Sequence, residues 1–462
     1  MTKEPNGGST RKGGGTMRRF STLAFVFAIA AAACTAGNGG DTVAPTVDPN
    51  AQHDPVTIDV WIPFSADHEV AAVQEGIDLF KAEYPWITVD VRTGMEDDNK
   101  TLAAIRAGNP PDAVMSWALD DLPKFCDTGA WVDLNPYIQQ SGWALEDHFP
   151  PSVAQYTGFG GSTCALPFLT DAIGLYYNTD LFEKAGLTEP PRTASELLEY
   201  AKELTEFNPD GSIKTAGFVP WFGYYVNGDP LNYSIVWDAN YYTEGVDQAA
   251  LASDPDWAEM FRWWKEMVDF YGAENLQKFV AGQGDEWSKP NDFHRGRVAM
   301  IVDGEWRTAF IDQYAPDLNY MTAPMPVPDD AQDQYGVGRV GGTILGIPKG
   351  SPHPAEAWLL VEFLATNTDA LVAAANTLKN VPTTFDAMES PDLEVTPQFQ
   401  TFLDIFQNPG SHYKQMTVLG SADQDLVSGF ATRWQAGKIP DLEAGLQDLQ
   451  QRLNDQLEQA GA

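Results

Sequence analysis

The stretch VTIDVWIP at residues 56–63 decides the fold, because it alternates apolar and polar side chains as a half-buried β-strand does. Immediately after it, residues 70–80 place apolar side chains three and four positions apart, which predicts an amphipathic helix. The apolar positions of the two patterns are Ile58, Val60 and Ile62 in the strand and Val70, Val73, Ile77 and Phe80 in the helix. A strand followed directly by a helix is the start of a βαβ unit.

The alternation of strands and helices continues beyond this unit. A second strand is predicted over residues 87–91 and a short helix over 101–107, and the breaker Gly-Asn-Pro-Pro at 108–111 separates that helix from an apolar third strand at 113–115. The order is therefore βαβαβ. We expect an α/β protein with a doubly wound parallel sheet and with ligands at the carboxyl ends of its strands.

Composition and charge exclude several classes of protein. The chain has 462 residues, 43% of them hydrophobic, which is enough for one large or two ordinary cores and excludes a wholly disordered chain. Its 65 Asp and Glu against 28 Lys and Arg give a formal net charge of −37, which repels nucleic acid and anionic lipid headgroups. The six His and three Cys show no zinc-site spacing, so we expect no metal and no cofactor.

The N-terminal residues predict a signal for export followed by a flexible tether. A basic start at residues 17–19 and an apolar run at 23–33 are typical of a secretory signal, and the run is too short to cross a membrane. Cys34 follows a run of four alanines, which resembles a bacterial lipobox and predicts lipidation of Cys34; the alternative is ordinary cleavage with an incidental cysteine. We therefore expect a signal peptide over residues 1–33 and a flexible tether over 34–55.

Three later features concern packing. The pair Thr193 and Glu196 is a capping box that opens a helix, and in an exported protein Cys126 and Cys164 are expected to form a disulfide. Two further helices are predicted by apolar faces that we assign to the core. These faces are Trp257, Phe261, Trp264, Met267 and Val268 in the first and Leu442, Leu446, Leu449, Leu453 and Leu457 in the second.

One long stretch of the sequence, residues 166–187, matches the signature of a known family. Residues 166–187, LPFLTDAIGLYYNTDLFEKAGL, with Pro-Pro-Arg-Thr at 190–193, resemble the signature of bacterial extracellular solute-binding proteins, whose best-known branch binds maltodextrins and other sugars. Further matching motifs follow in the order of the family. They are AGNPPD at 107–112, FHRGRVAM at 293–300, GEW at 304–306, GGT at 341–343, GIPK at 346–349 and QAGK at 435–438.

The resemblance implies a two-lobed periplasmic-binding-protein-like fold of class II type, with interleaved lobes that close around a hinge. Lobe one would hold residues 56–169 and 344–385, and lobe two residues 170–340 and 386–462. The hinge would lie near Leu169, Val340 and Thr384. The chain would be a monomeric, extracytoplasmic, lipid-anchored binding component of an ABC importer rather than an enzyme, with membrane permease subunits as partners.

The resemblance also suggests which residues bind the ligand. A sugar presents hydroxyls that suit carboxylates and a C–H face that packs on aromatic rings, so a sugar site should combine acids with tryptophans. The family's positions fall here on Trp117, Asp120, Asp171, Trp221, Trp306 and Ser65, which replaces a charged residue of the maltodextrin-type branch. Gly341 and Gly342 predict a close backbone approach rather than a phosphate-binding loop, and Gly342 is counted among the candidate site residues. Trp237 and Asp238, which follow an apolar run, are added as a second stacking ring and acceptor.

Each of these residues also has a purely structural interpretation. Ser65, Asp120 and Asp171 could cap helices or turns, and the tryptophans could fill the core. A secreted glycoside hydrolase would likewise combine tryptophans with carboxylates. Other ligands left open are polyols, peptides, glycerol phosphodiesters, metal chelates and quaternary amines held by cation–π contact; an anion would favour clustered Arg, which the candidate positions lack.

Overall fold

The computed structural model describes residues 44–48, 51–220, 228–284 and 288–461. The predicted βαβαβ unit is present: β1 (Val56–Trp61), α1 (Asp67–Glu83), β2 (Ile87–Arg92), α2 (Asp98–Arg106) and β3 (Ala113–Ser116) follow one another, and β1 pairs in parallel with both β2 and β3. The buried side chains of α1 include Val73, Ile77 and Phe80, as the spacing predicts.

One long strand, β6 (Leu166–Asn178), joins two groups of strands. Among the described residues ten strands form one sheet, in which β2-β1-β3-β11 lie on one side of β6 and β9-β8-β7 on the other. The remaining members are β7 (Glu206–Phe207), β8 (Ile213–Phe218), β9 (Val298–Gly304), β10 (Tyr320–Ala323), β11 (Val340–Gly346) and β12 (Val381–Pro382). A separate hairpin is made by β4 (Gly158–Phe159) and β5 (Ser162–Thr163).

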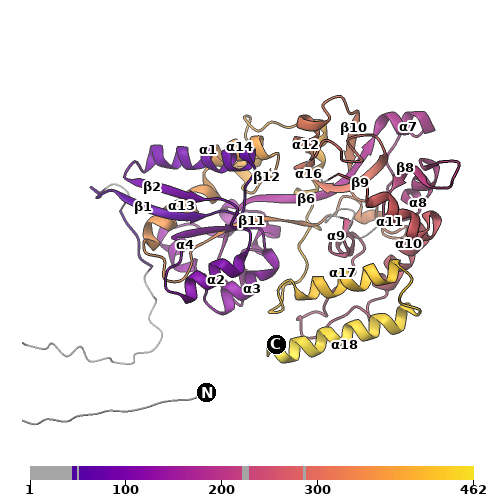
Figure 1. Ribbon diagram of the computed structural model, residues 1–462. Coiled ribbons are helices and arrows are strands. Elements are labelled where there is room, and N and C mark those ends of the chain that lie inside the picture. Colours follow the sequence, from indigo (N-terminus) through magenta and orange to yellow (C-terminus); the bar gives the residue numbers. More distant parts are fainter. Residues whose placement is uncertain (1–43, 49–50, 221–227, 285–287, 462) are drawn as a thin grey trace, which may run out of the picture. The chain divides into compact units, whose positions relative to one another are not determined.

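The sheet is mixed rather than wholly parallel. Pairing is parallel in β2-β1-β3 and in β8-β9, but β11 pairs antiparallel with β3 and β6, and β6 with β9. Strand β6 leaves β11 after Ala172 and begins to pair with β9 at Ile173. Strand β6 runs from one group of strands to the other (Figure 1), and its change of partner supports the predicted lobes, whose boundaries stay a prediction.

Helices cover the two groups of strands separately. On the first group, α1 packs on β2 and α13 on β3, and α14 packs on both helices. On the second group, α8 and α11 pack on β8, and α10 contacts these two helices as well as α9, α17 and α18. The helices not yet located are η1 (Leu119–Asp121), α3 (Leu122–Asp127), α4 (Asn135–Ser141), α5 (Leu145–His148), α6 (Pro151–Ala154), α7 (Thr179–Ala185), α8 (Ala194–Glu203), α9 (Pro230–Val236), α10 (Pro255–Tyr271), α11 (Ala273–Val280), α12 (Arg307–Tyr314), η3 (Gln332–Gln334), α13 (Pro354–Thr366), α14 (Thr368–Leu378), α15 (Phe385–Met388), α16 (Pro397–Gln407), α17 (Ala422–Gln435) and α18 (Leu442–Ala460).

The packing predictions are confirmed. Thr193 accepts the backbone N–H of Glu196, and the Glu196 carboxylate accepts the N–H of Thr193, so the capping box opens α8 as expected. The predicted apolar faces of α10 and α18 are buried throughout. Cys126 and Cys164 form a disulfide, with their Cα atoms 5.6 Å apart.

The described part of the predicted tether contacts the domain. Ala44 is buried and its carbonyl accepts a hydrogen bond from the Gln140 side chain on α4, while the His53 ring stacks on Trp86 at 3.9 Å. Cys34 and the signal region lie outside the described residues. Within the described part of the chain, no single helix meets the length and hydropathy expected of a membrane span; α13 and α14 do so only together, with a 65° bend between them.

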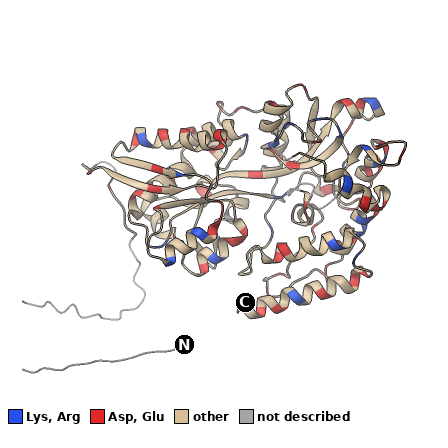
Figure 2. Ribbon diagram, viewed as in Figure 1, with Lys and Arg blue, Asp and Glu red and all other residues tan. Residues whose placement is uncertain are grey.

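Acidic side chains are spread over the helices of both groups rather than gathered in one patch (Figure 2). Several are paired with nearby Lys residues, as in the exposed ion pairs of Glu206 with Lys184 and Lys214. This distribution is typical of a solvated surface.

Candidate ligand-binding site

A cavity of about 220 Å³ lies where several distant segments meet. One wall is the segment that follows β3, the opposite wall is formed by the start of α9 and the start of α17, and residues 339 and 413 complete it. The lining residues are Trp117, Ala118, Leu119, Asp120, Asp121, Asp229, Leu231, Asn232, Arg339, Tyr413, Ser421 and Gln424. Two of the predicted site residues, Trp117 and Asp120, are therefore at this cavity.

The end of β3 explains why Trp117 is exposed. The Ser116 hydroxyl donates to the Asp98 carboxylate at 2.9 Å and accepts the N–H of Ala118 at 3.0 Å, so the chain turns sharply as the strand ends. Trp117 lies at this turn with 43% of its surface exposed, and its ring makes a T-shaped contact with the ring of Phe64. A large flat ring held in this way offers an open face to the cavity.

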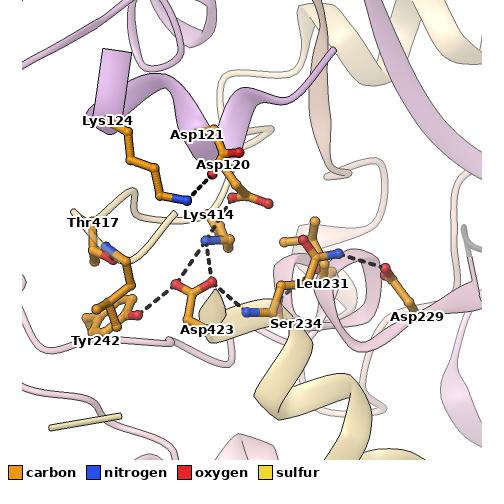
Figure 3. A network of polar contacts seen from close by, with 12 residues as sticks. Asp120, Asp121, Lys124, Asp229, Leu231, Ser234, Tyr242, Lys414, Thr417 and Asp423 are labelled. Carbon is orange, nitrogen blue, oxygen red and sulfur yellow. Dashed lines mark hydrogen bonds and ion pairs between the residues drawn. The ribbon is translucent and has the colours of Figure 1, made fainter. Parts of the chain in front are cut away.

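Asp120 is held by a buried lysine that the sequence did not point to. Lys414 Nζ lies 2.8 Å from Asp120 Oδ1 and 3.0 Å from both carboxylate oxygens of Asp423, as Figure 3 shows. Burial raises the pKa of Asp120, and the nearby Lys414 charge offsets part of that rise. Burial alone would lower the pKa of Lys414, but Asp120 and Asp423 together raise it, so the lysine stays charged.

Asp229 supplies a second carboxylate. It caps α9 by accepting the N–H of Asn232 at 3.1 Å, and its other oxygen accepts the side-chain amide of Gln424 from α17 at 3.0 Å. Burial raises the pKa of Asp229 to about 6, with backbone N–H groups and the Arg339 charge opposing the rise. The Asp229 carboxylate thus lies at the cavity wall, where it can accept a further hydrogen bond from a ligand hydroxyl.

Arg339 is the cationic group of the cavity that sequence reasoning missed. It lies just before β11, with its guanidinium carbon 5.6 Å from the centre of the Tyr413 ring. Its buried Nε has no hydrogen-bond partner among the described residues. The only nearby signal was the Gly341–Gly342 pair two residues later, which predicts a close backbone approach but says nothing about a charge.

A third group of acids lies where β6, β9 and β12 meet. The Asn380 amide donates to Asp171 Oδ1 at 2.6 Å and to Glu305 Oε1 at 2.9 Å, and Glu305 Oε2 accepts the N–H of Ala172. Burial raises the pKa of Asp171 to about 6. Burial and then the charge of Asp171 raise the pKa of Glu305 well above its usual range.

This pair predicts a pH dependence of stability. Both carboxyls have folded-state pKa values above their ordinary ones, so the stability they contribute is fully present below about pH 4 and is lost as the pH rises through about 6 and beyond. Asp171→Asn removes one charge and keeps an acceptor for Asn380. We expect its free energy of unfolding to exceed that of the wild type at pH 8 by about 1.4 kcal/mol, the value of one pKa unit.

Urea denaturation at pH 4, 6 and 8 measures this difference. Asp448→Asn, on the exposed face of α18, is the matched control and should leave the pH dependence unchanged. An Asp171→Asn variant that parallels the wild type from pH 4 to pH 8 would show that folding does not raise the pKa of Asp171.

The other predicted site residues lie in different settings. Ser65 is exposed, and its N–H donates to Glu69 at the start of α1; Trp306 is partly buried at the end of β9, beside Glu305. Trp237 is buried against Trp263, and Asp238, with a φ of 53°, lines a smaller cavity of about 30 Å³ together with Lys414. Trp221 lies outside the described residues.

Gly342 is explained by close strand packing. A Cβ atom at this position would lie 2.3 Å from the Leu169 carbonyl oxygen of β6, so the two backbones approach as the sequence predicted for this pair of glycines. Whether Gly342 and the residues of the preceding paragraph contact ligand stays a prediction.

Known proteins resemble this chain in sequence and in fold. The maltotriose-binding protein of Pyrococcus abyssi is 22% identical over 336 residues, which are 72% of this chain and 68% of that protein. The sn-glycerol-3-phosphate-binding periplasmic protein of Escherichia coli K12 is 25% identical over 286 residues, 59% of this chain and 61% of that protein. The structure of CpMnBP1 with mannotriose bound is 27% identical, covers 86% of this chain and 99% of that one, and has a TM-score of 0.74.

The family itself is identified by a longer match. The model of the bacterial extracellular solute-binding proteins matches residues 66–370, which include β6, β9 and most of the cavity wall. This is more than half of the chain, and the strand arrangement around β6 agrees with the two-lobed fold of the structural relatives. The chain therefore belongs to the bacterial extracellular solute-binding protein family.

Proposed function

We propose that this chain binds a neutral sugar or oligosaccharide in the cavity lined by Trp117, Asp229 and Arg339 and releases it unaltered. One observation carries the proposal: an exposed indole lies on the same small cavity as carboxylates and a guanidinium. The indole suits the C–H face of a sugar ring, and the charged groups suit its hydroxyls. The binding of mannotriose and maltotriose by two relatives supports the same class of ligand.

An anionic solute is a second candidate, because Arg339 is at the cavity and one relative binds sn-glycerol-3-phosphate. The surroundings favour a neutral ligand instead. Asp120, Asp121 and Asp229 line the same cavity. Burial raises the pKa values of Asp171 and Glu305, and the Arg339 charge opposes that rise, which places the guanidinium close to those two acids as well. A phosphate in this cavity would therefore be repelled by several carboxylates and attracted by one guanidinium, that of Arg339.

The setting proposed for this binding follows from the family. The chain would be held outside the cytoplasm by a lipid on Cys34, act as a monomer, and deliver its solute to the permease subunits of an ABC importer. Incorporation of labelled fatty acid that disappears in Cys34→Ser tests the anchor. Binding without catalysis is supported by the relatives, which are named as binding proteins.

A thermal-shift panel tests the class of ligand. A solute that binds only the folded chain stabilises it by about 2.7 kcal/mol at one hundred times its Kd, which shifts the Tm of a chain of this size by several degrees. We expect that shift with a neutral oligosaccharide such as mannotriose or maltotriose. A shift only with sn-glycerol-3-phosphate, glycine betaine or a peptide would contradict the proposal.

A further inference from the structure

Lys414 connects two sides of the cavity through a buried ion network. Its side chain is 2% exposed, and its two partners Asp120 and Asp423 are 10% and 0% exposed. Asp120 lies in η1, which packs on β11 and α3, whereas Asp423 lies in the first turn of α17, which packs on α9 and α10. The lysine therefore joins elements that belong to the two different groups of strands and helices.

The network is anchored more firmly on the α17 side. Asp423 gives Lys414 two contacts of 3.0 Å and also accepts the Tyr242 hydroxyl at 2.7 Å and the N–H of Gln424. The Tyr241 ring lies 5.5 Å from the ammonium on the same side. Toward η1 the lysine makes one contact, the 2.8 Å ion pair with Asp120 (Figure 3).

This asymmetry allows the single contact to break without leaving an unpaired buried charge. If the two sides separate, Lys414 keeps its ion pair with Asp423, and Asp120 is exposed to water. A buried ion pair is costly to break when one partner stays buried and alone, but that cost does not arise here. All the contacts of Lys414 described above are with other side chains of the chain, so the network can form without a bound solute.

We propose that Lys414 is a positioning residue whose ion pair with Asp120 holds the two sides of the cavity together and fixes the Asp120 carboxylate at the cavity wall. The inference goes beyond the proposed function, since it makes no use of which solute is bound. It predicts that the chain closes partly by itself and that the lysine sets the proportion of closed molecules.

The same segment offers a matched control. Lys124 forms an ion pair with Asp121 at 2.6 Å, one residue away from Asp120 in sequence, but both residues lie within the 119–127 segment and the pair is partly exposed. Lys124 lies close to Gly420, but its ion pair is within the 119–127 segment, so Lys124→Met removes the same charge and leaves the Lys414–Asp120 ion pair intact. Surface pairs of this kind contribute little to stability.

Distances between spin labels test the proposal in the sugar-free protein. The labels are placed on the full chain with Cys34→Ser, at Lys100→Cys on α2 and Arg452→Cys on α18, both exposed positions on opposite sides of the junction. In pulsed dipolar spectroscopy we expect one main distance for the parent protein. Lys414→Met should add a longer-distance population, at least tenfold larger than in the parent, and Lys124→Met should not.

Asp120→Asn provides a second variant if Lys414→Met folds poorly, because it leaves the Lys414–Asp423 pair intact and weakens the contacts that Asp120 makes with Lys414 and with the neighbouring Tyr413. It should give the same longer distance. Excess mannotriose should restore the shorter distance in both variants. If the variants show the longer distance but mannotriose does not restore the shorter one, the result contradicts the proposed sugar ligand and leaves the proposed role of Lys414 intact. Unchanged distance distributions in folded Lys414→Met and Asp120→Asn would overturn the proposal.

Discussion

The Trp117→Ala variant is expected to bind its oligosaccharide about 30-fold more weakly than the wild type. The ring is 43% exposed at the cavity and makes a T-shaped contact with Phe64, so much of its surface is available to pack on a sugar. Anchoring aromatic residues of this kind contribute about 2 kcal/mol or more to binding, and each 1.4 kcal/mol corresponds to roughly a factor of ten in Kd.

The control for this variant is an aromatic residue of equal exposure away from the cavity. Phe207 on β7 is 42% exposed and packs against Phe270 and Tyr271. Isothermal titration calorimetry should give the wild-type Kd for Phe207→Ala and the weakened Kd for Trp117→Ala, with both variants folded by circular dichroism. A Trp117→Ala variant within threefold of wild type would remove this ring from the site.

The second large effect concerns the disulfide. Cys126 at the end of α3 is joined to Cys164 just before β6, with a sequence separation of 38 residues. In the chain-entropy model, a closed loop of that length stabilises the folded state by about 4 kcal/mol. We expect the Cys126→Ala, Cys164→Ala double variant to lose that much free energy of unfolding in urea.

Reduction of the wild-type chain is the matched comparison. The intact mass should rise by two hydrogen atoms on reduction, and the reduced chain should unfold at the urea concentration found for the double variant. Because the bond ties α3, which follows Trp117 and Asp120, to the start of β6, its loss should loosen the same cavity wall. A double variant as stable as the oxidised wild type would contradict this account.

The sequence predicts local features of this chain well. The capping box at Thr193 and Glu196 and the buried faces of α10 and α18 depend on spacing within a single element, and the βαβαβ unit depends on elements that follow one another in sequence. Trp117 and Asp120 could be placed near a ligand because they follow β3, and the carboxyl ends of parallel strands line ligand sites. The antiparallel pairing of β6 depends on strands far apart in sequence and could not be read from local alternation.

The rest of the cavity could not be predicted for the same reason. Asp229, Arg339, Tyr413 and Lys414 lie in irregular segments or at helix ends, and only the tertiary fold brings them within reach of Asp120. The buried Lys414 in particular follows no apolar periodicity, because its burial is stabilised by Asp120 and Asp423 rather than by its own segment. Sequence spacing reports packing faces and carries little information about such ion networks.

A crystal structure of the chain grown with the oligosaccharide that gives the largest thermal shift is the most direct test of the central claim. The account predicts intact sugar in the cavity, with one ring against the Trp117 indole and hydroxyls within hydrogen-bond distance of Asp229 and Arg339. A sugar bound elsewhere on the chain, or found cleaved, would contradict it.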